Sequence, residues 1–159
     1  MSLFIRALLI GGFATLVLDL WNLLLNRVFG FPLPNWGMVG RWFLHATRGR
    51  LAHENIATAP DFDNEPAWGW FFHYLVGVVF AFALLTIWPG WAANPTIWPP
   101  MIVGWVTIGC GWFILAPGMG GGIAHSKRPN PNTPRLLNVA GHTVFGLGLW
   151  LAGLALRSF

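Results

Sequence analysis

Apolar residues dominate four stretches of the chain, and each stretch is long enough to cross a lipid bilayer. A hydrocarbon core about 30 Å thick requires roughly 20 consecutive apolar residues in an α-helix. The four stretches cover residues 3–26, 67–88, 97–116 and 136–156. Pro117 follows the third stretch, where a proline ends a helix. The pattern predicts an all-α integral membrane bundle of four transmembrane helices, formed as a single domain over residues 1–159.

A different pattern occurs in the connection between the first two stretches. Within "MVGRWFLHATRGRLAHENI" (residues 38–56), helical spacing places Val39, Trp42, Phe43 and Ala46 on one side and Arg41, His45 and Arg48 on another. This two-sided pattern is typical of a short helix that lies in the membrane interface. We expect an interfacial amphipathic helix at about residues 36–56. The alternative is an ordinary loop with aromatic content.

Two pairs of short segments resemble each other in the same order along the chain. "GFATL" at residues 12–16 resembles "GWVTI" at residues 104–108, and "HYLVG" at residues 73–77 resembles "HTVFG" at residues 142–146. A duplicated two-helix hairpin with parallel repeats explains both similarities. The alternative is chance similarity between apolar pentapeptides.

The composition is typical of a membrane protein, and this affects how the net positive charge is interpreted. The chain is 55% hydrophobic and 9% charged, and it contains 11 Trp and 13 Phe. Soluble domains are about 25% charged. The formal charge of +4 is explained by basic loops facing an anionic leaflet. We therefore expect a lipid bilayer as the partner and no nucleic acid.

The distribution of basic residues predicts how the chain is oriented. Seven of the nine Lys and Arg residues lie in the first and third connections between the apolar stretches. Because Lys and Arg accumulate on the cytoplasmic side, both connections are expected in the cytoplasm. Both chain termini are then expected outside the cytoplasm.

One acidic residue interrupts the first apolar stretch. Asp19 lies on one helix face with Thr15, Asn22 and Asn26, at steps of four, three and four residues. A carboxylate near the bilayer centre costs about 2.5 to 3.5 kcal/mol, so it is expected to point into the bundle and meet a partner.

Two histidines are expected at a depth similar to that of Asp19. His73 lies about six residues into the second apolar stretch, and His142 lies about six residues into the fourth. Each is followed four residues later by a glycine, Gly77 or Gly146, on the same helix face. These glycines either let helix backbones approach closely or leave room for a bound group.

Four interpretations of this polar group remain open. A divalent metal ion would take Asp19, His73 and His142 as ligands, with His45 as a further candidate. A haem would be held by His73 and His142, with Gly77 and Gly146 making room for the macrocycle. Paired ionisable groups would also relay a proton. The fourth interpretation is structural, because hydrogen bonds between polar side chains hold membrane helices together without any ligand.

The chain also resembles a known family in several segments. "ATLVLDLWNLLL", "VGRW", "GGGIAHSKRPNPNTPR" and "HTVFGLGLWLAGL" occur in order over essentially the whole length. Together they resemble a small bacterial membrane family catalogued as domain of unknown function family 2938. The resemblance implies a four-span protein of the inner (plasma) membrane and implies no activity, substrate or cofactor.

The leading functional hypothesis is a multi-pass protein that binds a metal ion or small cofactor at the Asp/His site. The alternative is a structural or assembly subunit of a larger membrane complex, for which the abundant aromatic side chains provide contact surface. Proton or ion transport by a homo-oligomer is a further alternative. A catalytic role is disfavoured, because the sequence contains neither an H-E-x-x-H motif nor a dinucleotide-binding fingerprint.

Overall fold

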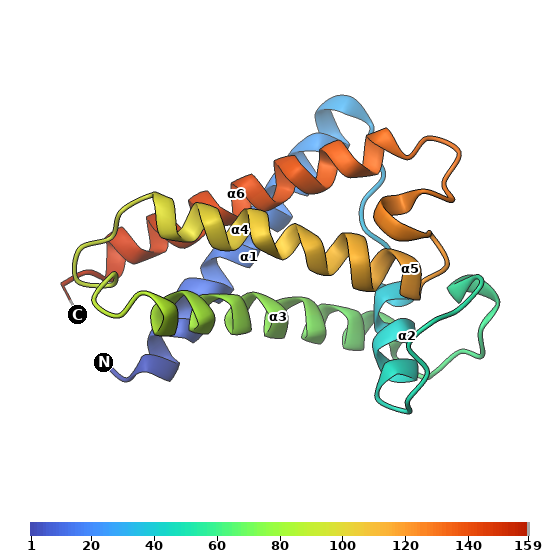
Figure 1. Cartoon of the computed structure of the whole chain (residues 1–159), viewed down its shortest axis with the longest axis horizontal. Coiled ribbons are helices and arrows are strands. Elements are labelled where there is room, and N and C mark those ends of the chain that lie inside the picture. Colours follow the sequence, from blue (N-terminus) through green and yellow to red (C-terminus); the bar gives the residue numbers. More distant parts are fainter. Residues whose placement is uncertain (159) are drawn as a thin grey trace. The chain divides into compact units, whose positions relative to one another are not determined.

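The computed structural model describes residues 1–158, which form helices and no strand. The α-helices are α1 (Leu3–Phe29), α2 (Trp36–Ala46), α3 (Glu65–Ile87), α4 (Trp98–Cys110), α5 (Ala116–Gly118) and α6 (Asn132–Leu156) (Figure 1). The π-helix η2 (Gly111–Leu115) joins α4 to α5, and the 3₁₀ turns are η1 (Ile56–Thr58) and η3 (Ile123–His125). The predicted all-α class is confirmed.

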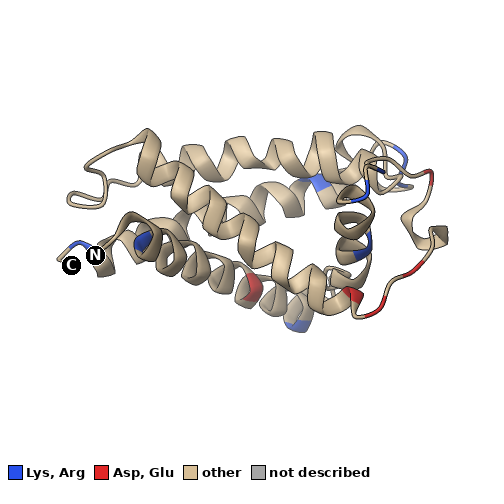
Figure 2. Cartoon of the chain, turned by 90° about the horizontal axis from the view of Figure 1, so that it is seen from below, with Lys and Arg blue, Asp and Glu red and all other residues tan. Residues whose placement is uncertain are grey.

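Four helical segments are long and apolar enough to cross a membrane. They are Leu3–Phe29, Glu65–Ile87, Trp98–Gly118 and Asn132–Leu156. The shortest has 21 residues. At 1.5 Å per residue it is about 31 Å long, which matches the hydrocarbon core. Few Lys, Arg, Asp or Glu residues interrupt their ribbons (Figure 2). The chain therefore has the helices of a multi-pass membrane protein, as the apolar pattern predicts.

Prolines stand in the first turns of three of these segments. Pro66, Pro99 and Pro134 each lie within the first three residues of their helices. The backbone N–H groups of a first turn have no partner inside the helix, so a proline that lacks this group fits there. Because Pro134 fits in the first turn, α6 begins at Asn132, four residues before the fourth apolar stretch.

The chain forms two compact units. Unit 1 comprises Met1–Leu33, Tyr74–Thr107 and Val139–Phe159, and unit 2 comprises Pro34–His73 and Ile108–Asn138. Unit 1 therefore contains α1 and the greater parts of α3, α4 and α6. Unit 2 contains α2, the short helices around residues 111–125 and the loops beside them.

Helix backbones in unit 1 approach each other closely at glycines. A Cβ atom added to Gly11 of α1 would lie 2.6 Å from the carbonyl oxygen of Gly77 in α3. One added to Gly148 of α6 would lie 2.9 Å from Cα of Ala14 in α1. Small residues allow such approach in membranes, where lipid tails are as apolar as the side chains and packing must hold the helices together.

Two tryptophans form hydrogen bonds in the α3–α4 loop, one from within the loop and one from α6. Trp91 is buried and donates its indole N–H to the carbonyl oxygen of Thr96 at 2.8 Å. Trp150 of α6 donates its indole N–H to the carbonyl oxygen of Pro95 at 3.3 Å. This loop lies at the end of unit 1 where α1 begins and α6 ends (Figure 1).

Unit 2 is built around α2. Asn35 caps this helix by accepting a hydrogen bond from Met38 N at 3.1 Å. A Cβ on Gly40 would overlap the Glu65 carbonyl oxygen, so α2 packs directly on the first turn of α3. The helix ends at Ala46, earlier than the expected range of about 36–56. A turn follows, in which Gly49 has a φ of 83°, favourable only for glycine.

Two adjacent glycines of α1 allow the close approach to α3 to be tested. We expect Gly11→Ala to destabilise the bundle by about 1 to 3 kcal/mol, because its methyl group would overlap the α3 backbone. Gly12→Ala is the matched control, since nothing lies within 4 Å of a Cβ at that position. The measurement is reversible unfolding in mixed micelles, followed by circular dichroism. Equal stability of the two variants would contradict the packing described here.

Candidate functional site

Asp19 meets a tyrosine inside unit 1. The Tyr74 hydroxyl of α3 donates a hydrogen bond to Asp19 Oδ2 at 3.0 Å. Thr15, one turn earlier on the polar face of α1, donates its hydroxyl to the Gly11 carbonyl oxygen of its own helix at 2.8 Å. The polar face of α1 therefore contacts α3 through Asp19 and makes local hydrogen bonds, which include one from Asn26 to the Phe31 carbonyl oxygen at 2.7 Å. Tyr74 was missed at the sequence level, although it is the single tyrosine of the chain and directly follows His73.

His142 of α6 forms its contacts with α4. Its Nδ1 atom lies 3.0 Å from the carbonyl oxygen of Gly104 and 3.1 Å from Thr107 Oγ1. A carbonyl oxygen only accepts hydrogen bonds, so Nδ1 carries the proton and donates it. In the neutral ring, Nε2 then keeps a lone pair. The arrangement fixes both the tautomer and the orientation of the ring.

Asp19 and His142 lie at a similar level of unit 1. A Cβ on Gly141 of α6 would lie 3.2 Å from Leu18 Cδ1 of α1. Leu18 precedes Asp19 and Gly141 precedes His142, so the contact brings both polar residues to one depth along these two helices.

The two glycines that follow the histidines lie at helix contacts. A Cβ on Gly77 would overlap Thr15 Oγ1 of α1. One on Gly146 would lie 3.0 Å from both Met101 Sδ and the Pro100 carbonyl oxygen. The space beside both glycines is therefore filled by neighbouring helices of unit 1.

The other two candidate histidines belong to unit 2. The His73 ring packs on the Trp36 ring, with 3.9 Å between the centroids and 30° between the planes. His45 is buried, and its Nε2 atom lies 2.9 Å from the Pro60 carbonyl oxygen. Among residues 1–158, no three side chains of the His, Cys, Asp or Glu types form a group that could hold a metal ion.

Arg41 joins three parts of unit 2. Its guanidinium binds both carboxylate oxygens of Glu65, with Nε at 2.7 Å from Oε1 and Nη2 at 3.0 Å from Oε2. Its Nη1 atom also donates to the Ala57 and Ala59 carbonyl oxygens, at 3.2 and 3.1 Å. The hydrogen bond to Glu65 raises the pKa of Arg41 above its ordinary value. This two-point pair fixes the loop before α3 against α2.

A second buried histidine lies beside His45. The ring centroids of His45 and His53 are 4.8 Å apart. His53 Nδ1 lies 3.1 Å from the Gly118 carbonyl oxygen, so Nδ1 is the donor and Nε2 holds the lone pair. This Nε2 atom is buried without a hydrogen-bond partner among residues 1–158.

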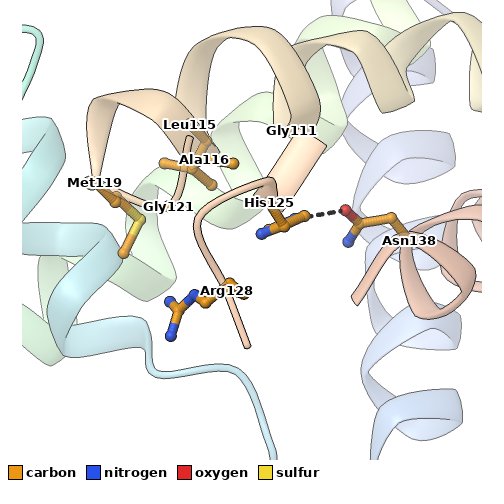
Figure 3. Close-up of a pocket in the computed structure, with 8 residues that line it drawn as sticks. All are labelled: Gly111, Leu115, Ala116, Met119, Gly121, His125, Arg128 and Asn138. Carbon is orange, nitrogen blue, oxygen red and sulfur yellow. Dashed lines mark hydrogen bonds between the residues drawn. The ribbon is translucent and has the colours of Figure 1, made fainter. Parts of the chain in front are cut away.

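A pocket of about 170 Å³ opens in unit 2 around the end of the third apolar segment. It is lined by Gly111, Leu115, Ala116, Met119, Gly121, His125, Arg128 and Asn138 (Figure 3). The wall is mostly apolar, and the polar groups come from η3, the loop after it and the start of α6. His125 points toward Asn138, and Arg128 extends from the neighbouring loop (Figure 3).

Asn138 is in hydrogen-bond contact with two side chains at this pocket. Its Oδ1 atom accepts from Trp112 Nε1 at 3.0 Å and lies 3.1 Å from His125 Nε2. An indole N–H can only donate, so the contact with Trp112 identifies the oxygen end of the Asn138 amide. His125 Nε2 must then carry a proton and donate it. The two N–H groups of the Asn138 amide have no hydrogen-bond partner among the described residues.

The segment that carries His125 has an unusual backbone. Ala124 and His125 have φ angles of 47° and 61°, in the left-handed region. Each such residue costs of order 1 to 3 kcal/mol, and residues of this kind cluster at functional sites. Arg135 stabilises the segment by donating from Nε to the Ala124 carbonyl oxygen at 2.7 Å. The sequence alone did not identify the contact between His125 and Asn138.

The long apolar helices and their internal polar contacts define a class, that of all-α, multi-pass membrane proteins. Within it, the chain matches the family model described as "Protein of unknown function (DUF2938)" over residues 8–156. The chain belongs to this family, and the predicted membership of domain of unknown function family 2938 is confirmed. No curated protein and no solved structure matches the chain.

The Arg41 contacts predict a large effect from a single substitution. We expect Arg41→Ala to destabilise unit 2 by about 3 to 5 kcal/mol, because Glu65 would keep a buried charge without its partner. Arg50→Ala is the control, since Arg50 is an exposed residue of the same segment. Thermal unfolding and limited chymotryptic cleavage of residues 47–64 measure the effect. Equal resistance of residues 47–64 to cleavage in both variants would refute a stabilising role for the Arg41–Glu65 pair.

Proposed function

We propose that this protein has a structural role in the membrane, in which Asp19 and His142 hold helices of its own bundle together. The observation that carries the proposal is the hydrogen bond from the Tyr74 hydroxyl to Asp19 Oδ2 at 3.0 Å. The bond offers a reason for a carboxylate in an apolar helix, because Asp19 meets a hydrogen-bond donor on the next transmembrane segment.

The magnitudes of the two interactions agree with this role. Placing a carboxylate near the bilayer centre costs about 2.5 to 3.5 kcal/mol, and a hydrogen bond between membrane helices returns about 0.6 kcal/mol on average. The bond therefore lowers the cost of Asp19 and selects one helix arrangement. Close packing between the helices must supply the rest of the stability. His142 has the same character, since its Nδ1–H donates to the Gly104 carbonyl oxygen.

As a structural component, the protein would associate with a further membrane protein or a second copy of itself. Helix α4 offers an apolar face for this purpose, on which Ile102, Trp105 and Val106 are each at least 42% exposed. These residues lie at positions i, i+3 and i+4 and so share one side of the helix. Proton or ion transport by such an oligomer stays a prediction.

Binding of a metal ion or small cofactor is the second proposal, and the tautomer of His142 favours it. A histidine that ligates a metal commonly donates its other ring N–H to a carbonyl or carboxylate. His142 donates from Nδ1 in this way, which leaves the Nε2 lone pair for a ligand. In unit 1 the proposed metal ligand is His142, with Asp19 at a similar level. His73, as a metal or haem ligand, and His45, as a further metal ligand, belong to unit 2 and stay predictions from the sequence.

Elemental analysis and a visible absorption spectrum separate the two proposals. The protein is solubilised gently and kept away from chelators throughout. The structural role predicts no stoichiometric metal and no chromophore, in the native protein or in His142→Ala. Cofactor binding requires a stoichiometric metal or a haem band that His142→Ala loses while the variant still folds. The second result would overturn the structural proposal.

A hydroxyl deletion tests the structural role separately. We expect Tyr74→Phe to lower the free energy of unfolding by about 0.5 to 1.5 kcal/mol, because Asp19 loses a donor. Thr86→Val is the matched control on the same helix, because among residues 1–158 the Thr86 hydroxyl bonds only to the Phe82 and Ala83 carbonyl oxygens of α3. Unfolding in mixed micelles provides the measurement. If Tyr74→Phe were as stable as Thr86→Val, the bond would have no structural importance.

A further inference from the structure

We propose that the unit 2 pocket lined by Gly111, His125, Arg128 and Asn138 binds a phosphate group. Its volume is about 170 Å³. A cavity that holds a single water molecule needs a volume of roughly 10 to 15 Å³, so this pocket has room for a compact polyatomic anion. The side chains that surround it supply hydrogen-bond donors and one cation.

The donors are already oriented before any ligand arrives. The indole N–H of Trp112 and the Nε2–H of His125 both use the oxygen end of the Asn138 amide, at 3.0 and 3.1 Å. The nitrogen end is therefore left to donate, with two N–H groups and no described partner. A phosphate oxygen accepts such hydrogen bonds.

Arg128 provides the positive charge. Its Nε atom would lie 3.8 Å from a Cβ on Gly121, so the side chain extends along the glycine-rich turn at the pocket wall. Among residues 1–158, the salt bridge found joins Arg41 to Glu65, and Arg128 pairs with no carboxylate. Residues 108–138 include three basic and no acidic residues. A pocket lined by both an exposed guanidinium and an amide with free donors favours a phosphate over a cation or a neutral group.

The position of the pocket in the chain indicates where the phosphate comes from. The π-helix η2 and α5 end the apolar segment Trp98–Gly118, and Asn138 lies in the second turn of the segment Asn132–Leu156. The ends of membrane-spanning segments lie at the level of lipid headgroups. Leu115, Ala116 and Met119 add an apolar wall. Phospholipid headgroups and soluble phosphate both carry the chemistry that the pocket would recognise.

The experiment compares two probes on the full chain in detergent. Inorganic phosphate is titrated by calorimetry, and retention of phosphatidylglycerol is counted by native mass spectrometry. We expect saturable binding of at least one probe. Binding of both indicates recognition of the phosphate alone, and binding of phosphatidylglycerol alone identifies the headgroup as the source.

Two variants distinguish a defined pocket from diffuse charge. Arg128→Ala is expected to weaken binding by at least about tenfold, as loss of one charge-assisted contact implies. Lys127→Ala is the control, since this neighbouring exposed cation does not line the pocket. Asn138→Asp keeps the shape of the side chain and its acceptor for Trp112 but replaces the free donors with negative charge, so it is also expected to weaken binding.

The proposal has clear contrary results. Absence of saturable binding of both probes to the native chain would overturn it. Equal weakening by Arg128→Ala and Lys127→Ala would also overturn it, because the contribution would then be general surface charge. Circular dichroism of each variant confirms that the fold is retained, and Arg128→Ala serves if Asn138→Asp fails to fold.

Discussion

Direct backbone contact between helices, made possible by glycine, is the constraint on which the rest of this structure depends. Lipid offers no hydrophobic driving force for one apolar helix to leave it for another, so close packing must supply the attraction. Gly11 in unit 1 and Gly40 in unit 2 both lie where any side chain would overlap a neighbouring backbone. The polar contacts follow from this proximity. Gly104 shows the connection, since a Cβ there would lie 2.5 Å from the His142 carbonyl oxygen, and its own carbonyl accepts from the His142 ring.

The sequence pattern was sufficient to predict the class of fold. It also predicted that Asp19 needs a partner inside the bundle. Long apolar segments can satisfy their backbone groups in lipid only as helices, so four helices follow from four runs. The partner itself was not predictable. Helices that are apolar on all sides show no periodicity that identifies which face meets which neighbour. Tyr74 is turned toward Asp19 by packing at Gly11 and Gly77, which no local pattern records.

The unit 2 pocket could not be predicted from the sequence, for a different reason. Its geometry depends on left-handed backbone angles at Ala124 and His125, conformations that these residue types rarely adopt. The surrounding contacts, such as the one from Arg135 to the Ala124 carbonyl oxygen, hold the segment in this form. In this form His125 Nε2 lies 3.1 Å from Asn138 Oδ1. The folded segment has a hydrogen-bond network that includes His125, Asn138 and Arg135.

The two units use polar side chains in different ways. In unit 1, the Tyr74 hydroxyl and the His142 ring donate to groups on neighbouring helices, which suits the membrane interior. In unit 2, the Asn138 side-chain oxygen accepts hydrogen bonds from two donors, and its amide hydrogens stay available. The first arrangement supports a structural role, and the second supports recognition of a small anion.

A double-mutant cycle between Asp19 and Tyr74 tests the structural role most directly. The variants are Asp19→Leu, Tyr74→Phe and the double variant, with the free energy of unfolding measured in mixed micelles. A coupling energy of about 0.5 to 1.7 kcal/mol is expected, the range known for hydrogen bonds between membrane helices. Full additivity of the two substitutions would contradict the proposal that this contact holds the bundle together.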